Sequence, residues 1–184
     1  MRLKPHLIAA ALIGSAILLM GDSNVGGFTQ EVCVVSGSTN WAALTTGSAY
    51  GAGNEVGGLI TLPAFYRTSR SGVAPQSVRL TFGDVQTAAF KAYQFSSKPT
   101  ASTWSDKAAP AIASGDVNKV RPPITLSNND SGLGTHTVYG ADSIARAVVS
   151  GSTDSNDSDY WIIVTSGTPT FTTQAQFCAS VLQD

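Results

Sequence analysis

Charged side chains are scarce in this chain of 184 residues. Lys, Arg, Asp and Glu together make up 12 % of it, which is about half the usual share for a soluble domain. Eleven basic and twelve acidic residues leave a formal net charge of −1. Because the chain lacks the excess of positive charge that phosphate contacts require, we expect no nucleic-acid partner.

Cysteine is equally scarce, with only Cys33 and Cys178. Neither stands in a CxxC or Cys/His spacing, so we expect no zinc site. We expect two buried apolar thiols, because unpaired cysteine is a commonly buried residue type. The alternative is one disulfide, which would join the first and last core strands.

Hydroxyl side chains take the place of the missing charges, with 22 serines and 19 threonines. Surfaces of this kind suit β-sheets and polar loops, whereas exposed helix faces normally carry Glu, Lys and Arg. A chain of 19.0 kDa has room for one ordinary domain. We therefore predict an all-β fold, with a single domain over residues 21–184.

Short apolar or alternating runs, separated by clusters of Gly, Pro, Asn and Ser, predict the strands. Their spacing is typical of a β-sandwich of the jelly-roll type. One run, YWIIV, is apolar throughout and indicates a central strand covered on both faces. Residues 105–113 favour at most a turn of helix, interrupted by Pro110. The predicted strands are 31–35, 55–62, 77–82, 88–95, 135–139, 144–149, 160–164 and 176–182.

Residues 1–20 form an apolar segment that begins with Arg2 and Lys4 and resembles a signal peptide. It is short for a transmembrane helix, and no small-x-small cleavage site precedes Gly21. We favour an arm that is retained and buried against a neighbouring subunit; a cleaved signal sequence is the alternative. The candidate partner contacts in the arm are Leu7, Ile8, Leu12, Ile13, Ile17, Leu18 and Leu19.

Residues 17–24, ILLMGDSN, resemble the nucleophile block of the GDSL hydrolases, in which the serine, here Ser23, attacks an ester. That chemistry needs a histidine base, usually in a D-x-x-H motif. His136 has Leu133 at the position of the aspartate, and SNND (127–130) matches the GxND block of those enzymes only loosely. We therefore assign no catalytic residue, and a hydrolase is the least favoured alternative.

The acidic loop DSNDSD (154–159) invites comparison with a calcium site. Against the EF-hand pattern it has Asp159 where glycine is required and Thr165 where the bidentate glutamate belongs. A solvated acidic loop is the preferred interpretation, and an irregular calcium site is the alternative. We assign no metal ligand and expect no cofactor or small-molecule substrate.

The most distinctive part of the chain runs from Gly57 to about Val120. It contains VGGLIT, then PQSVRL, then SSKPTASTWSDKAAP and finally GDVNKV. This order of motifs resembles a group of tailed-phage virion structural proteins. The matching positions are Gly57, Gly58, Arg67, Gly72, Gln76, Ser77, Leu80, Phe95, Pro99, Thr103, Trp104, Asp106, Ala108, Ala109, Asp116 and Lys119.

The resemblance covers about a third of the chain and implies a β-sandwich bound to a capsid or its neck. The segment around Trp104 can be a structural loop that the indole anchors onto a sheet, or a partner-contact loop. We favour the structural loop and retain Trp104 as a candidate partner contact. The matching stretch includes neither the apolar amino terminus nor the acidic loop.

These observations favour a non-enzymatic virion protein, a capsid decoration or cement protein that is oligomeric and binds the major capsid protein. A head–tail connector or tail component is the alternative within the particle. A secreted β-sandwich binding module is the alternative from another class, and it would use residues 1–20 as a signal.

Overall fold

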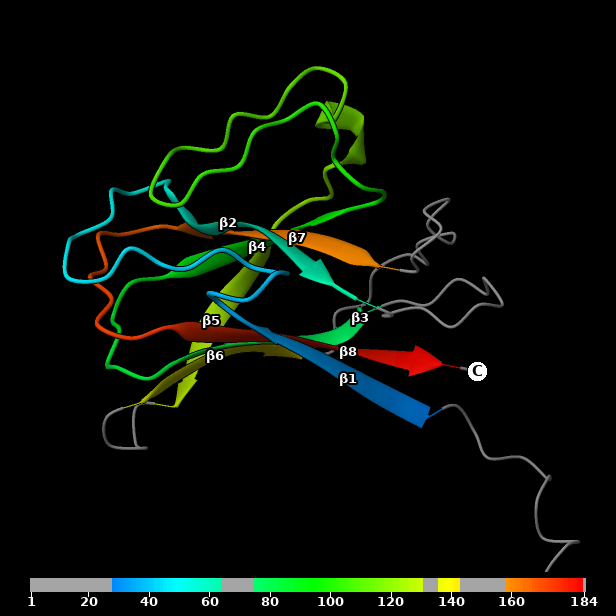
Figure 1. Ribbon diagram of the computed structural model, residues 1–184. Coiled ribbons are helices and arrows are strands. Elements are labelled where there is room, and N and C mark those ends of the chain that lie inside the picture. The colour runs from blue at the N-terminus through cyan, green and yellow to red at the C-terminus, as the bar shows by residue number, and fades with distance from the viewer. Residues whose placement is uncertain (1–27, 64–74, 131–135, 143–157, 184) are drawn as a thin grey trace, which may run out of the picture.

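Strands dominate the computed structural model, which describes residues 28–63, 75–130, 136–142 and 158–183 (Figure 1). The only helix within those residues is a 3₁₀ turn, η1 (Val117–Lys119). The eight strands are β1 (Phe28–Val35), β2 (Glu55–Leu62), β3 (Pro75–Phe82), β4 (Phe90–Phe95), β5 (Ile124–Asp130), β6 (Thr137–Asp142), β7 (Asp159–Thr165) and β8 (Ala175–Gln183). The all-β prediction is confirmed.

Most of the predicted strands are present, with ends that differ by one to three residues. The prediction at 135–139 is displaced, because β6 starts at Thr137. The prediction missed β5, whose first half alternates Ile124 and Leu126 but whose second half, SNND, is polar. The segment 105–113 forms turns and extended backbone with no helical turn. The predicted strand at 144–149 lies outside the described residues.

The strands form one nearly closed, barrel-like sheet in which every neighbouring pair is antiparallel. Their order is β1-β8-β3-β6-β5-β4-β7-β2. β1 and β2 are the two end strands, and the chain between them passes close to both. The backbone N–H of Thr61 donates to Asn40 O at 2.8 Å. The two ends of the sheet are therefore brought together by this connecting segment.

Cys33 and Cys178 form a disulfide, so the prediction of two free thiols is wrong. The two residues lie directly opposite each other in the antiparallel pair of β1 and β8, with their Cα atoms 4.1 Å apart. The preference for free thiols rested on burial, but Cys33 is exposed. The bond joins the first and last strands, as the alternative interpretation required.

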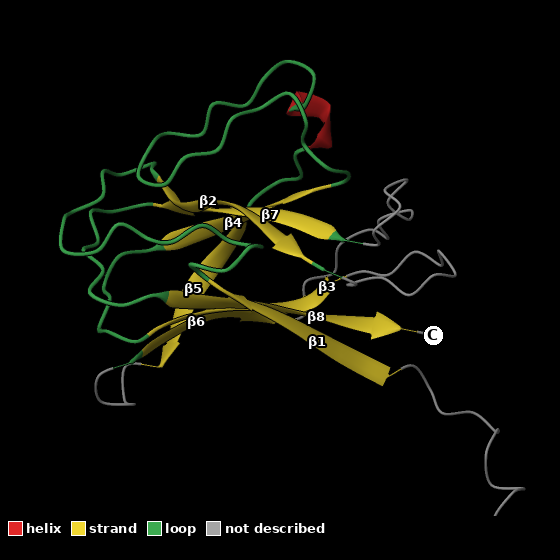
Figure 2. Ribbon diagram, viewed as in Figure 1, coloured by secondary structure: helices red, strands yellow, loops and turns green. Residues whose placement is uncertain are grey.

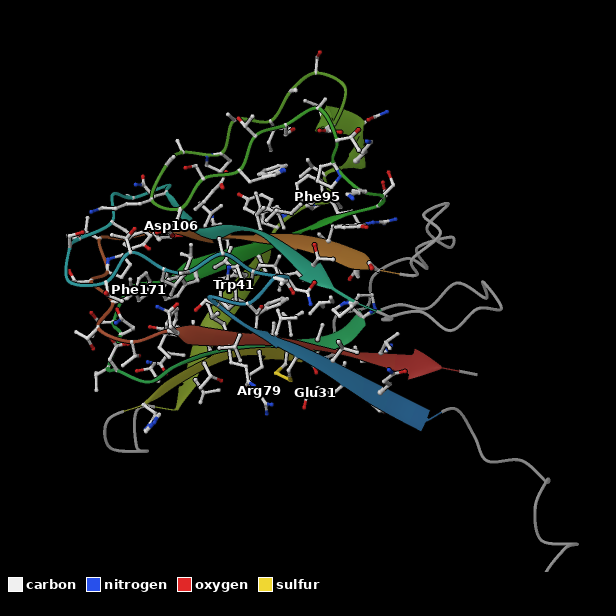
Figure 3. All side chains as sticks on the ribbon, viewed as in Figure 1. Glu31, Trp41, Arg79, Phe95, Asp106 and Phe171 are labelled. Carbon is white, nitrogen blue, oxygen red and sulfur yellow. A yellow bond between two sulfur atoms is a disulfide. The ribbon has the colours of Figure 1, made fainter. Side chains whose placement is uncertain are left out.

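Aromatic side chains fill the space between the two halves of the barrel (Figure 3). Phe82 stacks on Phe171 with ring centroids 4.8 Å apart, and Tyr50 meets Phe171 edge-on at 4.8 Å. Trp41 and Trp161 are buried in the same cluster. Each fully buried side chain of this size contributes about 1.5–3 kcal/mol to folding.

Strand β7, which pairs with β2 and β4, is apolar on both faces, as predicted, because each face contacts a different cluster. Trp161 and Ile163 point into the main core. Tyr160, Ile162 and Val164 point outward into a second cluster. Alternation along a strand sends successive side chains to opposite faces, so a strand covered on both sides must be apolar throughout.

The second cluster is covered by residues 96–123, which we call the capping loop and which arch over β2, β4 and β7 (Figure 2). The two ends of the loop are joined to each other: Ser96 N donates to Lys119 O, and Arg121 N donates to Gln94 O. Without the loop, the apolar outer face of this half of the sheet would be exposed to water.

Candidate functional site

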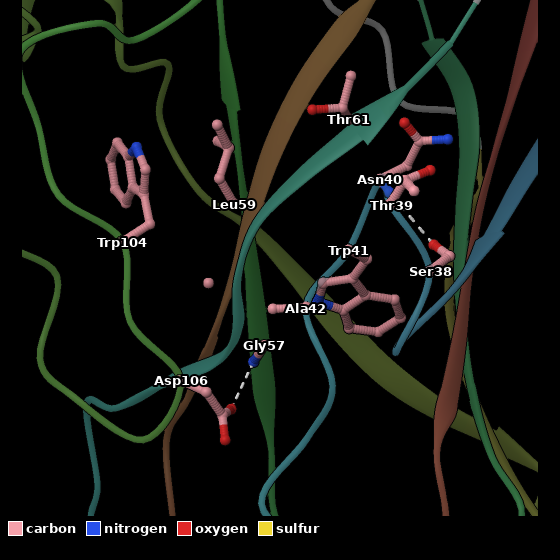
Figure 4. Close-up of a pocket in the computed structure, with 11 residues that line it drawn as sticks. Ser38, Thr39, Asn40, Trp41, Ala42, Gly57, Leu59, Thr61, Trp104 and Asp106 are labelled. Atoms are coloured by element: carbon pink, nitrogen blue, oxygen red, sulfur yellow. Dashed lines mark hydrogen bonds between the residues drawn. The ribbon is translucent and has the colours of Figure 1, made fainter.

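A groove of about 420 Å³ lies beside the first half of β2 (Figure 4). Three segments line it: residues 38–42, the β2 residues 57–61, and Trp104 with Asp106 from the capping loop. Two of these segments belong to the stretch from Gly57 to Val120 that is the most distinctive part of the sequence. The groove therefore lies where the start of β2 and the capping loop come together.

The adjacent glycines Gly57 and Gly58 shape the floor of the groove. Both have positive φ, at 73° and 70°, a conformation that glycine adopts without steric cost. They form an irregularity in β2, where the pairing with β7 shifts between Glu55 and Leu59. A Cβ atom on Gly57 would lie 2.2 Å from Nε1 of Trp41, so no larger residue fits.

Asp106 connects three separate segments through hydrogen bonds to its carboxylate. Gly57 N donates to Oδ1 at 2.6 Å, Thr45 N donates to Oδ2 at 2.7 Å, and the Tyr50 hydroxyl donates at 2.7 Å. Burial, and then the neighbouring Asp106 carboxylate, hold the pKa of Tyr50 well above its ordinary range. The phenol therefore stays a donor, and the capping loop is fixed to β2 and to the segment before it.

Asp116 holds the capping loop together from within, because its partners all belong to the loop. Its buried carboxylate accepts hydrogen bonds from the backbone N–H groups of Thr100, Ala101 and Ser102, and Lys119 Nζ lies 2.8 Å from Oδ1. The hydrogen bond from Lys119 is the main cause that holds the pKa of Asp116 well below its usual range. Asp116 thus stays ionised and holds the turn formed by residues 98–102 in place.

Trp104, two residues before Asp106, is half-buried. Its indole packs edge-on against Phe95 at 5.3 Å and belongs to the outer apolar cluster. The prediction that it anchors the loop onto a sheet is confirmed. It also lines the groove, so its role as a partner contact stays a prediction.

The groove offers hydrogen-bonding groups but no reactive arrangement within the described part of the chain. The side chains of Thr39, Asn40 and Thr61 line it and make no hydrogen bond to any described residue. Asp106 is occupied by its three donors, and no histidine lines the groove. The side chains of Thr39, Asn40 and Thr61 can therefore form hydrogen bonds with a bound partner.

Most of the other predicted site residues cannot be placed relative to the groove. The arm residues Leu7, Ile8, Leu12, Ile13, Ile17, Leu18 and Leu19 lie outside the described residues, as do Ser23, His6, Leu133, Arg67, Gly72 and most of the 154–159 loop. His136 is exposed and directly precedes β6 instead of lying within it.

Among the described residues, one group has the composition of a metal site, formed by Glu31, Cys33 and Cys178. Both of its sulfur atoms are in the disulfide, and Glu31 forms an ion pair with Arg79 at 3.1 Å. Neither thiolate is therefore present to act as a ligand. The described part of the chain also contains no helix with the length and apolar character needed to span a membrane.

Sequence reasoning missed Trp41, which lines the groove, and Tyr50 and Glu55, which hold the capping loop through hydrogen bonds to Asp106 and Ser105. Only Glu55 had a local indication, because it is one of two glutamates in the chain and opens an otherwise apolar strand. Asp106 and Asp116 were identified only as motif positions.

Comparisons with protein-family models, with curated proteins and with solved structures each give no match for this chain. The resemblance to tailed-phage virion proteins therefore stays a prediction.

Proposed function

We propose that this chain is a non-enzymatic structural protein of a tailed-phage particle, a decoration protein that binds and stabilises the major capsid protein shell. The observation that carries the proposal is that residues of the recognised motifs form the groove and hold the capping loop in place. Gly57 and Asp106 build the groove, and Asp116 and Lys119 close the capping loop. These motif residues therefore hold the groove and the capping loop in a defined shape, which supports a role in binding a partner.

The proposal includes a jelly-roll topology. Its support is the strand order, in which β1-β8-β3-β6 and β2-β7-β4-β5 form the two halves of the barrel. Two interlocked Greek keys of four strands each produce such an order. This architecture is common among capsid proteins, and among the described strands it leaves β1 and β2 as the two edges.

Two surfaces are suited to a protein partner. One is the groove, where Trp104 offers an aromatic anchor beside the unpaired polar side chains of Thr39 and Asn40. The other is the outer edge of β1, whose backbone groups can pair with a strand from a neighbour. The arm formed by residues 1–20 is expected to contribute a third contact, and the protein is expected to be an oligomer.

Mass spectrometry of purified particles tests this proposal. We expect the chain at a fixed ratio to the major capsid protein, with residues 1–20 present. A low ratio, of a few copies per particle, would place it in the neck or tail instead. The replacement Trp104→Ala should reduce its occupancy on the particle, whereas Val117→Ala, at an exposed position on the same loop, should not.

The disulfide favours a second candidate, a secreted β-sandwich binding module. Disulfides persist in oxidising compartments, and a secreted protein would use residues 1–20 as a signal. A chain that is absent from particles, and found in the medium starting near Gly21, would decide for this candidate. A hydrolase is supported by nothing in the described fold, because an α/β hydrolase requires a parallel sheet covered by helices.

A further inference from the structure

Glu55, the first residue of β2, is a buried carboxyl at the point where the capping loop is attached. Its side chain is 0 % exposed. Its backbone N–H donates to Ala108 O at 2.7 Å, and its carbonyl accepts from Lys107 N at 3.0 Å. Its carboxyl Oε2 accepts from Ser105 N at 3.1 Å. Residues 105–108 are therefore fastened to this one residue by three hydrogen bonds.

The carboxyl of Glu55 is poorly compensated for a charged group. Its Oε1 atom is buried and has no hydrogen-bond partner among the described residues. The pKa of Glu55 is raised to about 7, mainly by burial; the N–H of Ser105 opposes this rise, and the negative charge of Asp106 adds to it. The ammonium of Lys107 is directed elsewhere, over the ring of Tyr50 at 5.9 Å.

The protonated, neutral form of Glu55 is more stable at this buried position than the ionised carboxylate. In the ionised form, an unpaired charged oxygen would be buried next to a second carboxylate, that of Asp106, and both charge burial and repulsion are costly. Exposure of Glu55 to water removes both penalties. Moving residues 105–108 away from β2 is the direct way to expose it, because their hydrogen bonds cover it.

We propose that protonation of Glu55 fastens the capping loop onto β2 and that ionisation of Glu55 releases residues 105–108. Trp104 and Asp106 flank Ser105 and line the groove, so release of the segment remodels the groove wall. The groove is complete in mild acid and loosened in mild alkali. This inference goes beyond the proposed function, because it holds for any partner of the groove.

The direction with pH follows from the linkage between protonation and opening. Glu55 is protonated below its ordinary pKa of 4.5 in both the docked and the open state. Between pH 4.5 and about 7 only the docked state keeps the proton, so the opening constant rises with pH. The total rise is about two orders of magnitude, and it levels off above about pH 7.5.

Hydrogen exchange on the full chain measures this opening. We expect the amides of Ser105 and Lys107, after correction for the intrinsic pH dependence of exchange, to lose protection by about 100-fold between pH 5 and pH 8. Strands β3 and β8 should keep their protection. Glu55→Gln, which is neutral at every pH, should remove most of the change. Glu31→Gln is the matched control, because Glu31 is the only other glutamate and is exposed.

A titration of the wild-type protein makes the test independent of how well the variant folds. With only two glutamates, the side-chain carboxyl carbon of Glu55 can be followed directly by nuclear magnetic resonance. We expect its midpoint near pH 7. A midpoint near 4.5 would overturn the proposal, as would equal protection of residues 105–108 at pH 5 and pH 8.

Discussion

Removal of the Cys33–Cys178 disulfide is expected to destabilise the protein strongly. The bond joins residues 145 positions apart, so it closes a loop that contains nearly the whole described body. The chain-entropy relation for a loop of this length gives about 5 kcal/mol of stabilisation. Since small domains have net stabilities of about 5–15 kcal/mol, this one bond accounts for a large share of the total.

Equilibrium urea unfolding of the double variant Cys33→Ala/Cys178→Ala measures the effect. With a denaturant slope of about 2 kcal/mol/M, a loss of 5 kcal/mol shifts the midpoint down by about 2.5 M. In a reducing agent, the wild-type protein should have the same urea midpoint as the double variant. The midpoint of the double variant itself should not change when the reducing agent is added. Val35→Ala, at a half-exposed position on the same strand, should change the midpoint little. A shift below about 0.3 M for the double variant would refute this reasoning.

Two further substitutions test the supports of the groove. Gly57→Ala should lower the free energy of unfolding in urea by about 2–5 kcal/mol, because the backbone has positive φ and the new methyl group would clash with Trp41. Gly53→Ala, which has positive φ but nothing within 4 Å of the new methyl group, should lower it by only about 1–2 kcal/mol. Equal losses in the two variants would show that the contact with Trp41 is unimportant. Asp116→Asn should lower the urea midpoint at pH 7, and the variant should lose less stability in acid than the wild type does. The reason is that the pKa of Asp116 is depressed. Its carboxylate therefore stabilises the fold above its ordinary pKa, and this stabilisation is lost as the pH falls below about 4. An unchanged acid profile in the variant would contradict the role of the ion pair with Lys119.

The strand content was predictable because it depends on short-range patterns. In SVRLTF the apolar residues alternate with polar ones, and the structure buries Val78, Leu80 and Phe82 on one face of β3. The apolar run in β7 likewise indicated a strand covered on both sides. The strand β5 escaped prediction because only Ile124 and Leu126 carry its alternation before the sequence becomes polar.

The groove was less predictable than the strands, because its parts come from distant segments. The glycine pair and Trp104 were identified as motif positions, but nothing local indicated that Trp41 occupies the space a side chain at Gly57 would need. The role of Asp106 also depends on partners far along the chain, because it binds Thr45 and Tyr50, which lie more than 50 positions away.

The sequence by itself determined the fold class, the approximate strands and the existence of one structured loop, because hydrophobic alternation and turn residues act between near neighbours. Tertiary structure alone decided whether Cys33 and Cys178 pair, since a disulfide requires the two Cα atoms to approach within bonding reach and only the register of β1 against β8 brings them together. It also decided the state of Glu55. A carboxyl that is ordinary in the sequence becomes a buried acid only when residues 105–108 lie across it and remove the water that would hold its charge.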